Sequence, residues 1–155
     1  MKALIQRVRE ASVSVNGALH GRIEKGLLIF LGIKQDDTPD AALYLAQRCS
    51  NLRIFGDEKG NMNLSVKDVG GSVLVISQFT LYADTRKGNR PSFTNAAPAN
   101  IAEPLYLDFV RHLSDELGPS KVCTGVFRAM MDIHLVNDGP VTVLVESKSP
   151  EDQSG

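Results

Sequence analysis

Gly26-Leu27-Leu28-Ile29-Phe30-Leu31-Gly32-Ile33 contains the longest apolar stretch of this 155-residue chain. Its length suits a strand. It is too short for a helix that crosses a membrane, which needs about 20 consecutive apolar residues. An apolar run without polar alternation is typical of a strand that is buried on both faces. A second run of this kind, Ser72-Val73-Leu74-Val75-Ile76-Ser77, follows two glycines. The two runs therefore predict two fully buried strands of one sheet.

The residues before the first run alternate between apolar and polar side chains. This period of two, which indicates half-buried strands, occurs in Ala3-Leu4-Ile5-Gln6-Arg7-Val8 and in Ala11-Ser12-Val13-Ser14-Val15. Asn16-Gly17 then provides a strong hairpin turn before the next strand. The first third of the chain is therefore expected to be built from strands.

Two segments carry the three- and four-residue spacing of an amphipathic helix. In the first, Thr38 suits the N-cap and Pro39 suits the first helical position. Its apolar stripe consists of Ala42, Leu45, Cys49 and Leu52. A second helix is expected to end at Gly118-Pro119, and one face of it is made of Ile101, Leu105, Phe109, Leu113 and Leu117.

The remaining segments predict short strands and one long loop. Leu52–Phe55 is expected as a short strand, and Ile133–Val136 and Val141–Glu146 are expected as the last two strands. Residues 80–99 are polar and irregular. Loops of this length inside compact domains are usually functional or disordered, so this one is a candidate functional segment.

These elements predict an α/β fold with mixed, largely antiparallel, barrel-like sheets and two main helices. With 43% apolar and 23% charged side chains, the chain has the composition of a globular protein with one core. We therefore expect a single domain over residues 1–147. Residues 148–155 are polar and are expected to form a flexible tail.

Charge and composition narrow the classes of function. Seventeen basic and 18 acidic residues give a net charge of −1, so the total charge does not call for nucleic acid, although a local patch can still guide a phosphate backbone. The two cysteines and three histidines are scattered, so no metal site and no cofactor site is expected. No signal peptide, transit peptide or membrane span is recognisable, and a reduced cytoplasm is the expected compartment.

Four segments could carry chemistry, and each also has a purely structural interpretation. Ser77-Gln78-Phe79-Thr80-Leu81-Tyr82 either places an active site at the end of a buried strand or simply enters solvent. Gly139-Pro140 is either a special backbone feature or an ordinary hairpin turn. Arg86-Lys87-Gly88-Asn89-Arg90-Pro91-Ser92-Phe93 could bind phosphates or be a solvated loop. Gly125-Val126-Phe127-Arg128-Ala129-Met130-Met131 could line a pocket or fill the core.

Several common catalytic arrangements are missing from the sequence. It contains no glycine-rich phosphate loop, no serine or cysteine with a local histidine, and no metal-ligand spacing. An enzyme built from this chain must therefore use positioned hydroxyls, backbone donors and groups of its substrate.

In this order and spacing, these segments resemble the D-aminoacyl-tRNA deacylase family, also known as D-Tyr-tRNA deacylases, whose members edit mischarged tRNA. The matching residues are Leu4-Ile5-Gln6-Arg7-Val8, Gly71-Ser72-Val73-Leu74-Val75, Ser77-Gln78-Phe79-Thr80-Leu81, Arg90-Pro91-Ser92-Phe93 and Leu135-Val136-Asn137-Asp138-Gly139-Pro140-Val141-Thr142. The Ser-Gln-Phe-Thr and Asn-Asp-Gly-Pro-Val-Thr segments are highly specific as a pair. Arg128 and Met130 depart from the family, where a small residue and often an acid are expected.

The resemblance implies a homodimer with two active sites at the subunit interface, and tRNA as the partner. It implies a catalytic segment, next to the aminoacyl-adenosine end of the tRNA, made of Ser77, Gln78, Phe79 and Thr80. Substrate binding and chiral selection would fall to Gly139, Pro140, Asn137, Arg7, Phe127 and Met131. The Gly139-Pro140 pair, with a cis bond, would enter the pocket of the other subunit and reject L-amino acids. Contacts to the tRNA would come from Arg86, Lys87 and Arg90.

The substrates implied by the resemblance are D-aminoacyl-tRNAs and glycyl-tRNA mischarged on tRNA-Ala, hydrolysed without metal or cofactor. Two mechanisms stay open. Thr80 could be the nucleophile, but a hydroxyl is weak without a base. Alternatively, and preferably, the substrate's 2′-hydroxyl helps to activate water while the Phe79 and Thr80 N–H groups stabilise the oxyanion. Two other functions remain open: a relative that edits L-alanyl-tRNA, and a non-catalytic tRNA-binding module on the same fold.

Overall fold

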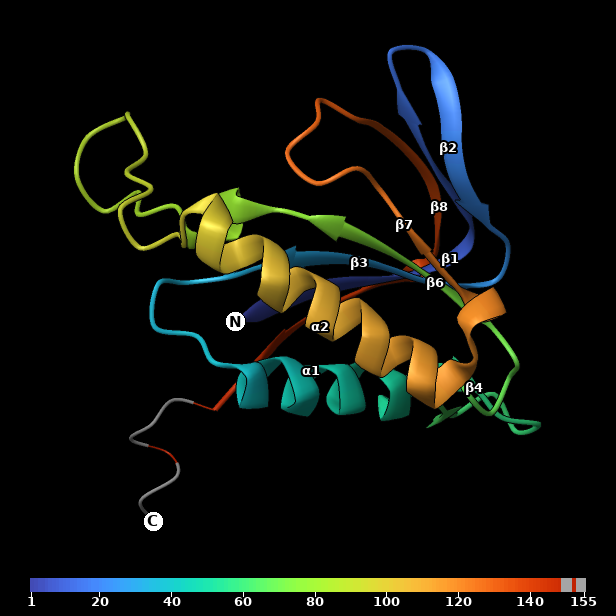
Figure 1. Cartoon of the computed structure of the whole chain (residues 1–155). Helices are drawn as coiled ribbons and strands as arrows, with labels where there is room; N and C mark the ends of the chain where they lie inside the picture. Colours follow the sequence, from blue (N-terminus) through green and yellow to red (C-terminus); the bar gives the residue numbers. More distant parts are fainter. Residues whose placement is uncertain (149–151, 153–155) are drawn as a thin grey trace.

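A computed structural model describes residues 1–148 and 152 of the chain (Figure 1). The strands are β1 (Lys2–Val15), β2 (Ala18–Ile23), β3 (Gly26–Gly32), β4 (Phe55–Gly56), β5 (Met62–Leu64), β6 (Ser72–Ser77), β7 (Val122–Thr124) and β8 (Asp132–Glu146). The helices are α1 (Pro39–Asn51) and α2 (Ala99–Leu117), with short 3-10 helices η1 (Phe79–Tyr82) and η2 (Pro119–Lys121). The expected α/β class is confirmed.

The main sheet is mixed, as expected. Its strand order is β2-β1-β3-β6-β7, and β8 also pairs with β1. β1 is antiparallel to β2, β3 and β8, whereas β3, β6 and β7 are parallel to one another. β4 and β5 form a separate small sheet. The long strand β1 therefore organises the sheet, because β2, β3 and β8 all pair with it.

The sheet curls until its two ends meet. β2 and β7 lie at opposite ends of the strand order, yet the Cys123 thiol donates a hydrogen bond of 3.6 Å to the backbone carbonyl of Arg22. Gly21 makes this approach possible, because a Cβ there would lie 3.3 Å from the carbonyl oxygen of Thr124. The barrel-like expectation is confirmed in the form of a nearly closed sheet.

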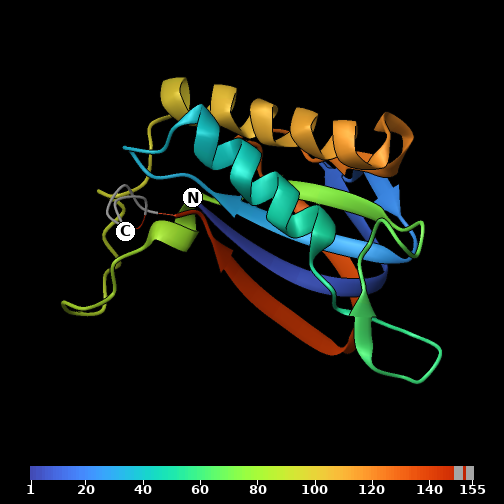
Figure 2. The same ribbon diagram turned by 90° about the horizontal axis from the view of Figure 1, so that it is seen from below.

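Both helices cover one face of this sheet, and a second core lies on its other face (Figure 2). On the helix side, Leu45 of α1 and Phe109 of α2 pack against the sheet and are fully buried. The Tyr106 hydroxyl on this side donates a 3.0 Å hydrogen bond to the carbonyl of Val75, and burial raises its pKa. On the other side, fully buried Leu74 packs in the second core. β3 and β6 are thus buried on both faces, as their apolar runs predict.

Several local predictions are confirmed at the residues that specify them. Thr38 caps α1, and its hydroxyl accepts a 3.4 Å hydrogen bond from the Ala41 N–H. Asn16 and Gly17 adopt φ values of +51° and +78°, the left-handed backbone that a tight hairpin turn requires. Gly118 ends α2 at φ +94°. In each case the conformation follows from local chemistry.

Other predictions were wrong because long-range pairing decided the outcome. The two expected strands at the end of the chain form one strand, β8, which stays paired with β1 across register shifts. The expected strand Leu52–Phe55 begins only at Phe55, since Leu52 caps α1. On α2 the first-turn residue Ile101 is 38% exposed, and Ala102 is buried in its place. The division at residue 147 stays a prediction, and residues 149–151 and 153–155 of the expected tail lie outside the described residues.

Candidate active site

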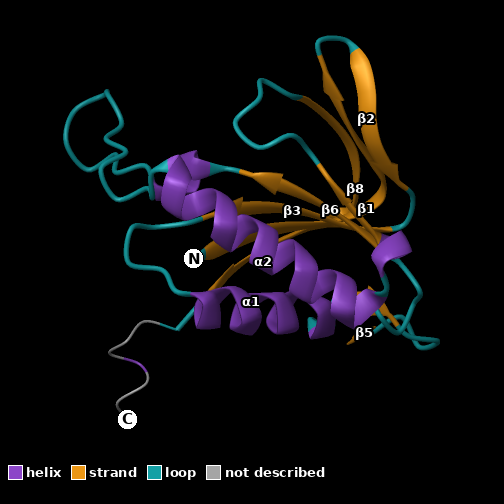
Figure 3. Cartoon of the chain, viewed as in Figure 1, coloured by secondary structure: helices purple, strands orange, loops and turns teal. Residues whose placement is uncertain are grey.

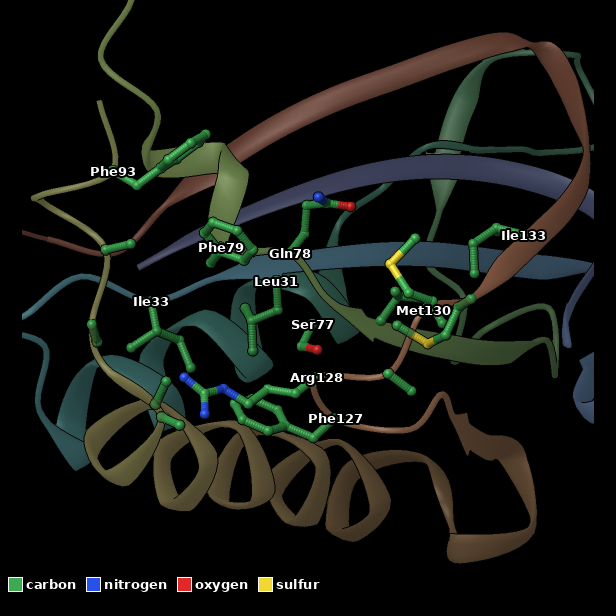
Figure 4. Close-up of a pocket in the computed structure, with 17 residues that line it drawn as sticks. Leu31, Ile33, Ser77, Gln78, Phe79, Phe93, Phe127, Arg128, Met130 and Ile133 are labelled. Atoms are coloured by element: carbon green, nitrogen blue, oxygen red, sulfur yellow. The ribbon is translucent and has the colours of Figure 1, made fainter. Parts of the chain in front are cut away.

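A pocket of about 740 Å³ opens at the carboxyl end of β6 (Figure 4). Its walls come from the ends of β3 and β6, from η1, from the first turn of α2, and from residues 93, 96, 97, 127–131 and 133. The long connection between η1 and α2 is mostly loop, as expected for residues 80–99 (Figure 3). This pocket therefore lies where the sheet, a helix and two loops converge.

The chain leaves the sheet at Ser77 and turns directly into η1. The Gln78 N–H donates the last hydrogen bond, of 2.8 Å, to the Leu31 carbonyl of β3. η1 then lies against Gly32, where a Cβ would come within 2.9 Å of the Leu81 Cβ. Gly32 therefore permits the close approach that places η1 at the edge of the pocket.

The structure brings together most of the predicted catalytic segment. Ser77, Gln78 and Phe79 line the pocket, and so do Phe127 and Met131. Figure 4 shows Phe127 across the pocket from Phe79. The Phe127 ring also contacts Tyr106 at 5.6 Å between centroids, so this aromatic residue serves both the pocket and the core. Phe127 therefore lines the pocket and also packs against the core, so for this residue both structural interpretations apply.

Thr80 is exposed and does not line the pocket among the residues that the structure describes. Its hydroxyl accepts a hydrogen bond from the Gln78 side-chain amide. No carboxylate, histidine or cysteine is among the described residues that line the pocket. Among the described residues of the pocket wall the charged side chain is Arg128, so this wall offers no general base.

The Gly139-Pro140 pair lies in a turn within β8, where the pairing of this strand with β1 shifts register between Gln6 and Val8. Its peptide bond is cis, Gly139 has φ +141°, and both residues are exposed. The Asn137 side-chain oxygen accepts a 3.0 Å hydrogen bond from the Val141 N–H. From the neighbouring strand β1, Arg7 Nε donates a 2.9 Å hydrogen bond to the carbonyl of Asp138. Asn137 and Arg7 therefore fix the shape of this turn.

This turn lies far from the pocket of its own chain. Arg7 pairs with Leu27, which pairs with Val73, whereas Ser77 lies four residues further along β6. At about 3.3 Å per residue the separation along the sheet is roughly 13 Å. Neither Gly139 nor Pro140 is among the described residues that line the pocket.

The predicted tRNA-binding cations lie on the exposed loop between η1 and α2, outside the pocket wall. Arg86 makes a two-pronged contact with Asp84, at 2.9 Å from Nε to Oδ1 and 2.7 Å from Nη2 to Oδ2. These bonds lower the pKa of Asp84 to about 2. Lys87 and Arg90 make no such contact among the described residues, so their charges are free for a ligand.

Phe93 lines the pocket, although the sequence predicted no role for it beyond its place in the candidate segment 86–93. Its ring meets that of Phe79 edge to face, at 5.2 Å between centroids and an angle of 70°. The two rings are 40% and 57% exposed at the pocket mouth. The signal was present, since Phe93 ends the Arg90-Pro91-Ser92-Phe93 motif, but the motif alone does not show that this ring would reach Phe79.

Among the described residues, no cluster of three or more His, Cys, Asp or Glu side chains is arranged to hold a metal ion. None of the helices in that part of the chain has the length and apolarity needed to cross a bilayer.

Comparison with known proteins gives one consistent result. The family model for D-Tyr-tRNA(Tyr) deacylase matches residues 4–146. The D-aminoacyl-tRNA deacylase of Syntrophobacter fumaroxidans is 55% identical over 148 residues, which cover 96% of this chain and 98% of the relative. That of Chlorobaculum tepidum is 53% identical over 147 residues, covering 95% of this chain and 97% of the relative.

Two solved structures have the same fold as this chain. A protein described as c-Myc DNA Unwinding Element Binding Protein superposes with a TM-score of 0.92 and 40% identity, covering 96% of this chain and all of the other. A probable eukaryotic D-amino acid tRNA deacylase superposes with a TM-score of 0.82 at 16% identity, covering 94% and 98% of the two chains, which shows a shared fold. On the evidence of its sequence, from residue 4 to residue 146, this chain belongs to the D-Tyr-tRNA(Tyr) deacylase family.

Proposed function

We propose that this protein is a D-aminoacyl-tRNA deacylase. It hydrolyses the ester that joins a D-amino acid to the terminal ribose of a tRNA, and releases free amino acid and tRNA. The observation that carries the proposal is the placement of Ser77, Gln78 and Phe79 at an apolar pocket that has no acid, histidine or cysteine among its described lining residues. Such a site can position a substrate and stabilise charge, which suits hydrolysis of an already activated ester.

The start of η1 supplies the hydrogen-bond donors that would stabilise the oxyanion. The first N–H groups of a helix have no partner within the helix. Here those are the backbone N–H groups of Phe79 and Thr80, next to the pocket. They would donate to the carbonyl oxygen of the ester as it becomes an oxyanion, and removing one such donor typically costs a factor of about 100 to 1,000 in rate.

The attacking group in this mechanism is a water molecule. Water adds to the ester carbonyl, the bond to the ribose oxygen breaks, and that oxygen takes a proton. The 2′-hydroxyl of the same ribose helps to activate the water, because it is held next to the ester by the substrate itself. Thr80 acts as a positioning residue, since its hydroxyl contacts the Gln78 amide rather than a base.

Selection against L-amino acids would come from a second copy of the chain. The Gly139-Pro140 turn is exposed, fixed by Arg7 and Asn137, and roughly 13 Å along the sheet from its own pocket. In a homodimer it would enter the pocket of the partner subunit and occupy the space that an L-side chain needs. A rigid backbone wall excludes every L-amino acid by steric clash, while glycine, including glycine mischarged on tRNA-Ala, is accepted because it has no side chain.

The rest of the substrate would lie outside the pocket. Phe79 and Phe93 present exposed ring surface on which a base of the tRNA end can stack. The free cations Lys87 and Arg90, with Arg86 beside them, would follow the phosphate backbone. Aminoacyl-tRNA is consumed at the ribosome, so the reaction would take place in the cytoplasm.

One assay separates this function from its two alternatives. The purified protein is incubated with D-Tyr-tRNA, L-Tyr-tRNA, glycyl-tRNA-Ala and L-Ala-tRNA, and the ester remaining is measured. The proposal predicts loss of the D-tyrosyl and glycyl esters only. Hydrolysis of L-Ala-tRNA would indicate the L-alanyl-editing relative, and binding of tRNA without hydrolysis of any ester would indicate a non-catalytic module.

A further inference from the structure

Arg128 is an unpaired cation in the wall of the pocket. Figure 4 shows its guanidinium pointing toward Ile33 and away from Gln78 and Met130. Among the residues that the structure describes, this side chain makes no hydrogen bond and no ion pair. The described lining residues include no carboxylate, so the guanidinium has no opposite charge to meet inside the pocket.

Arg128 has a left-handed backbone conformation, which is uncommon for an arginine. It has φ +66°, in a tight turn that the Ala129 N–H closes with a 3.1 Å hydrogen bond to the Val126 carbonyl. Left-handed backbone is unfavourable for any residue with a Cβ, and glycine would fit here at no such cost. A side chain kept at an unfavourable φ in the wall of a binding site is a signal of function.

We propose that Arg128 binds the phosphodiester group on the 5′ side of the terminal adenosine of the tRNA. This inference rests on the proposed function. The substrate of that function has an ammonium group at its amino-acid end and phosphodiesters at its nucleotide end. A guanidinium repels the first and attracts the second, so Arg128 sets the direction in which the substrate lies.

The planar guanidinium suits this role better than an ammonium does. It can donate two parallel hydrogen bonds to the oxygens of one phosphate. Hydrogen bonds to charged groups correspond to a gain in affinity of roughly 10- to 100-fold. With the phosphate at Arg128, the ester would lie toward Ser77 and Phe79, as the proposed chemistry requires.

The test uses two stable probes that differ only in a phosphodiester. Each carries D-tyrosine joined by an amide to 3′-amino-3′-deoxyadenosine, and one has a methyl phosphodiester at the 5′ position. Their Kd values for the full-length protein are measured by titration calorimetry. We expect the phosphodiester probe to bind at least about tenfold more tightly to the wild type. Arg128→Gly should bind both probes with equal affinity, and Arg128→Lys should keep part of the preference.

Arg128→Gly is a suitable variant because glycine favours the left-handed backbone at this position, so the fold is retained. Equal binding of the two probes by the wild type, or an undiminished preference in Arg128→Gly, would overturn the assignment. A third probe with D-aspartate and no phosphate tests the other anion. If Arg128→Gly loses affinity only for this third probe, the guanidinium binds the side-chain carboxylate of the amino acid. That result would also overturn the assignment to a phosphodiester. Failure of the wild type to bind any probe would count against the proposed function itself, and the assignment would fall with it.

Discussion

Arg7 donates a hydrogen bond of 2.9 Å from Nε to the backbone carbonyl of Asp138 and thereby fastens the Gly139-Pro140 turn to β1. A second hydrogen bond, of 2.7 Å, runs from Nη1 of the same side chain to the carbonyl of Ile54. One arginine thus joins the turn to the segment before β4. The turn is exposed, yet its position is set by a side chain that is only 15% exposed.

Arg7→Ala is expected to lower both stability and activity. It leaves two carbonyl oxygens without their donor, which should cost about 1–3 kcal/mol in the free energy of unfolding, measured with urea. The freed turn should also lower kcat/KM for D-Tyr-tRNA. Arg9→Ala is the matched control, because Arg9 meets the same Asp138 at 3.5 Å but is 73% exposed. Equal effects of the two variants would contradict the role given to Arg7.

Gly139→Ala is expected to distort the turn while the rest of the fold stays intact. A Cβ at this position would lie 2.8 Å from both the Cγ2 and the backbone N of Val141, and φ is +141°. Hydrolysis of D-Tyr-tRNA should fall at least about tenfold, in line with a local strain of order 1–3 kcal/mol. Gly60→Ala is the control, since Gly60 also has positive φ (+80°) but no atom within 4 Å of its Cβ position. If the two variants hydrolyse D-Tyr-tRNA equally well, the turn has no part in the site.

Phe79→Pro tests the backbone donor directly. Proline removes the N–H at the first position of η1, where its φ is tolerated. Gln78 before it, at φ −146° and ψ 82°, lies outside the α region that a following proline disfavours. Phe79→Ala loses the same ring but keeps the N–H. We expect kcat of Phe79→Pro to be about 100-fold below that of Phe79→Ala.

Thr80→Ala removes the hydroxyl but keeps the backbone N–H groups of Phe79 and Thr80. Its kcat should fall by less than about 100-fold, and an acyl-enzyme on Thr80 would refute this mechanism.

Lys87→Ala and Arg90→Ala should weaken tRNA binding in a salt-dependent manner. Each neutralised phosphate contact contributes about 0.7 to the slope of log affinity against log salt for a single strand. Each substitution should reduce the slope by about that amount. Arg86→Ala should reduce it less, because Arg86 is already paired with Asp84. D-Tyrosyl-adenosine, which has no phosphates, is the control substrate. An equal loss of activity on this substrate would show that the cations do not act through the tRNA phosphates.

Sequence reasoning succeeded where the determinants are local. Thr38 and Asn16-Gly17 specify their cap and turn within a few residues, and the apolar runs of β3 and β6 follow from burial on both faces. It failed where distant pairing decides, as in β8, whose register with β1 no local pattern encodes. β7 is only three residues long and was not predicted for the same reason.

The candidate site divides along the same line. Ser77, Gln78 and Phe79 were found because they end a buried strand, which is a visible pattern. That Phe93 and Arg128 line the same pocket as this segment depends on two loops that are far apart in the sequence. The direction of the Arg128 guanidinium depends on a positive φ that no arginine signals in advance.

In the proposed homodimer, each active site combines the pocket of one subunit with the Gly139-Pro140 turn of the other. The most direct test mixes Gly139→Ala with Phe79→Pro, refolded together so that subunits exchange, and measures D-Tyr-tRNA hydrolysis. Each variant alone is expected to be nearly inactive. The mixture should recover about one quarter of wild-type activity, because half of the dimers would be mixed and each of these would contain one intact site. Activity of the mixture no greater than the average of the two variants would show that pocket and turn act within one chain or not together.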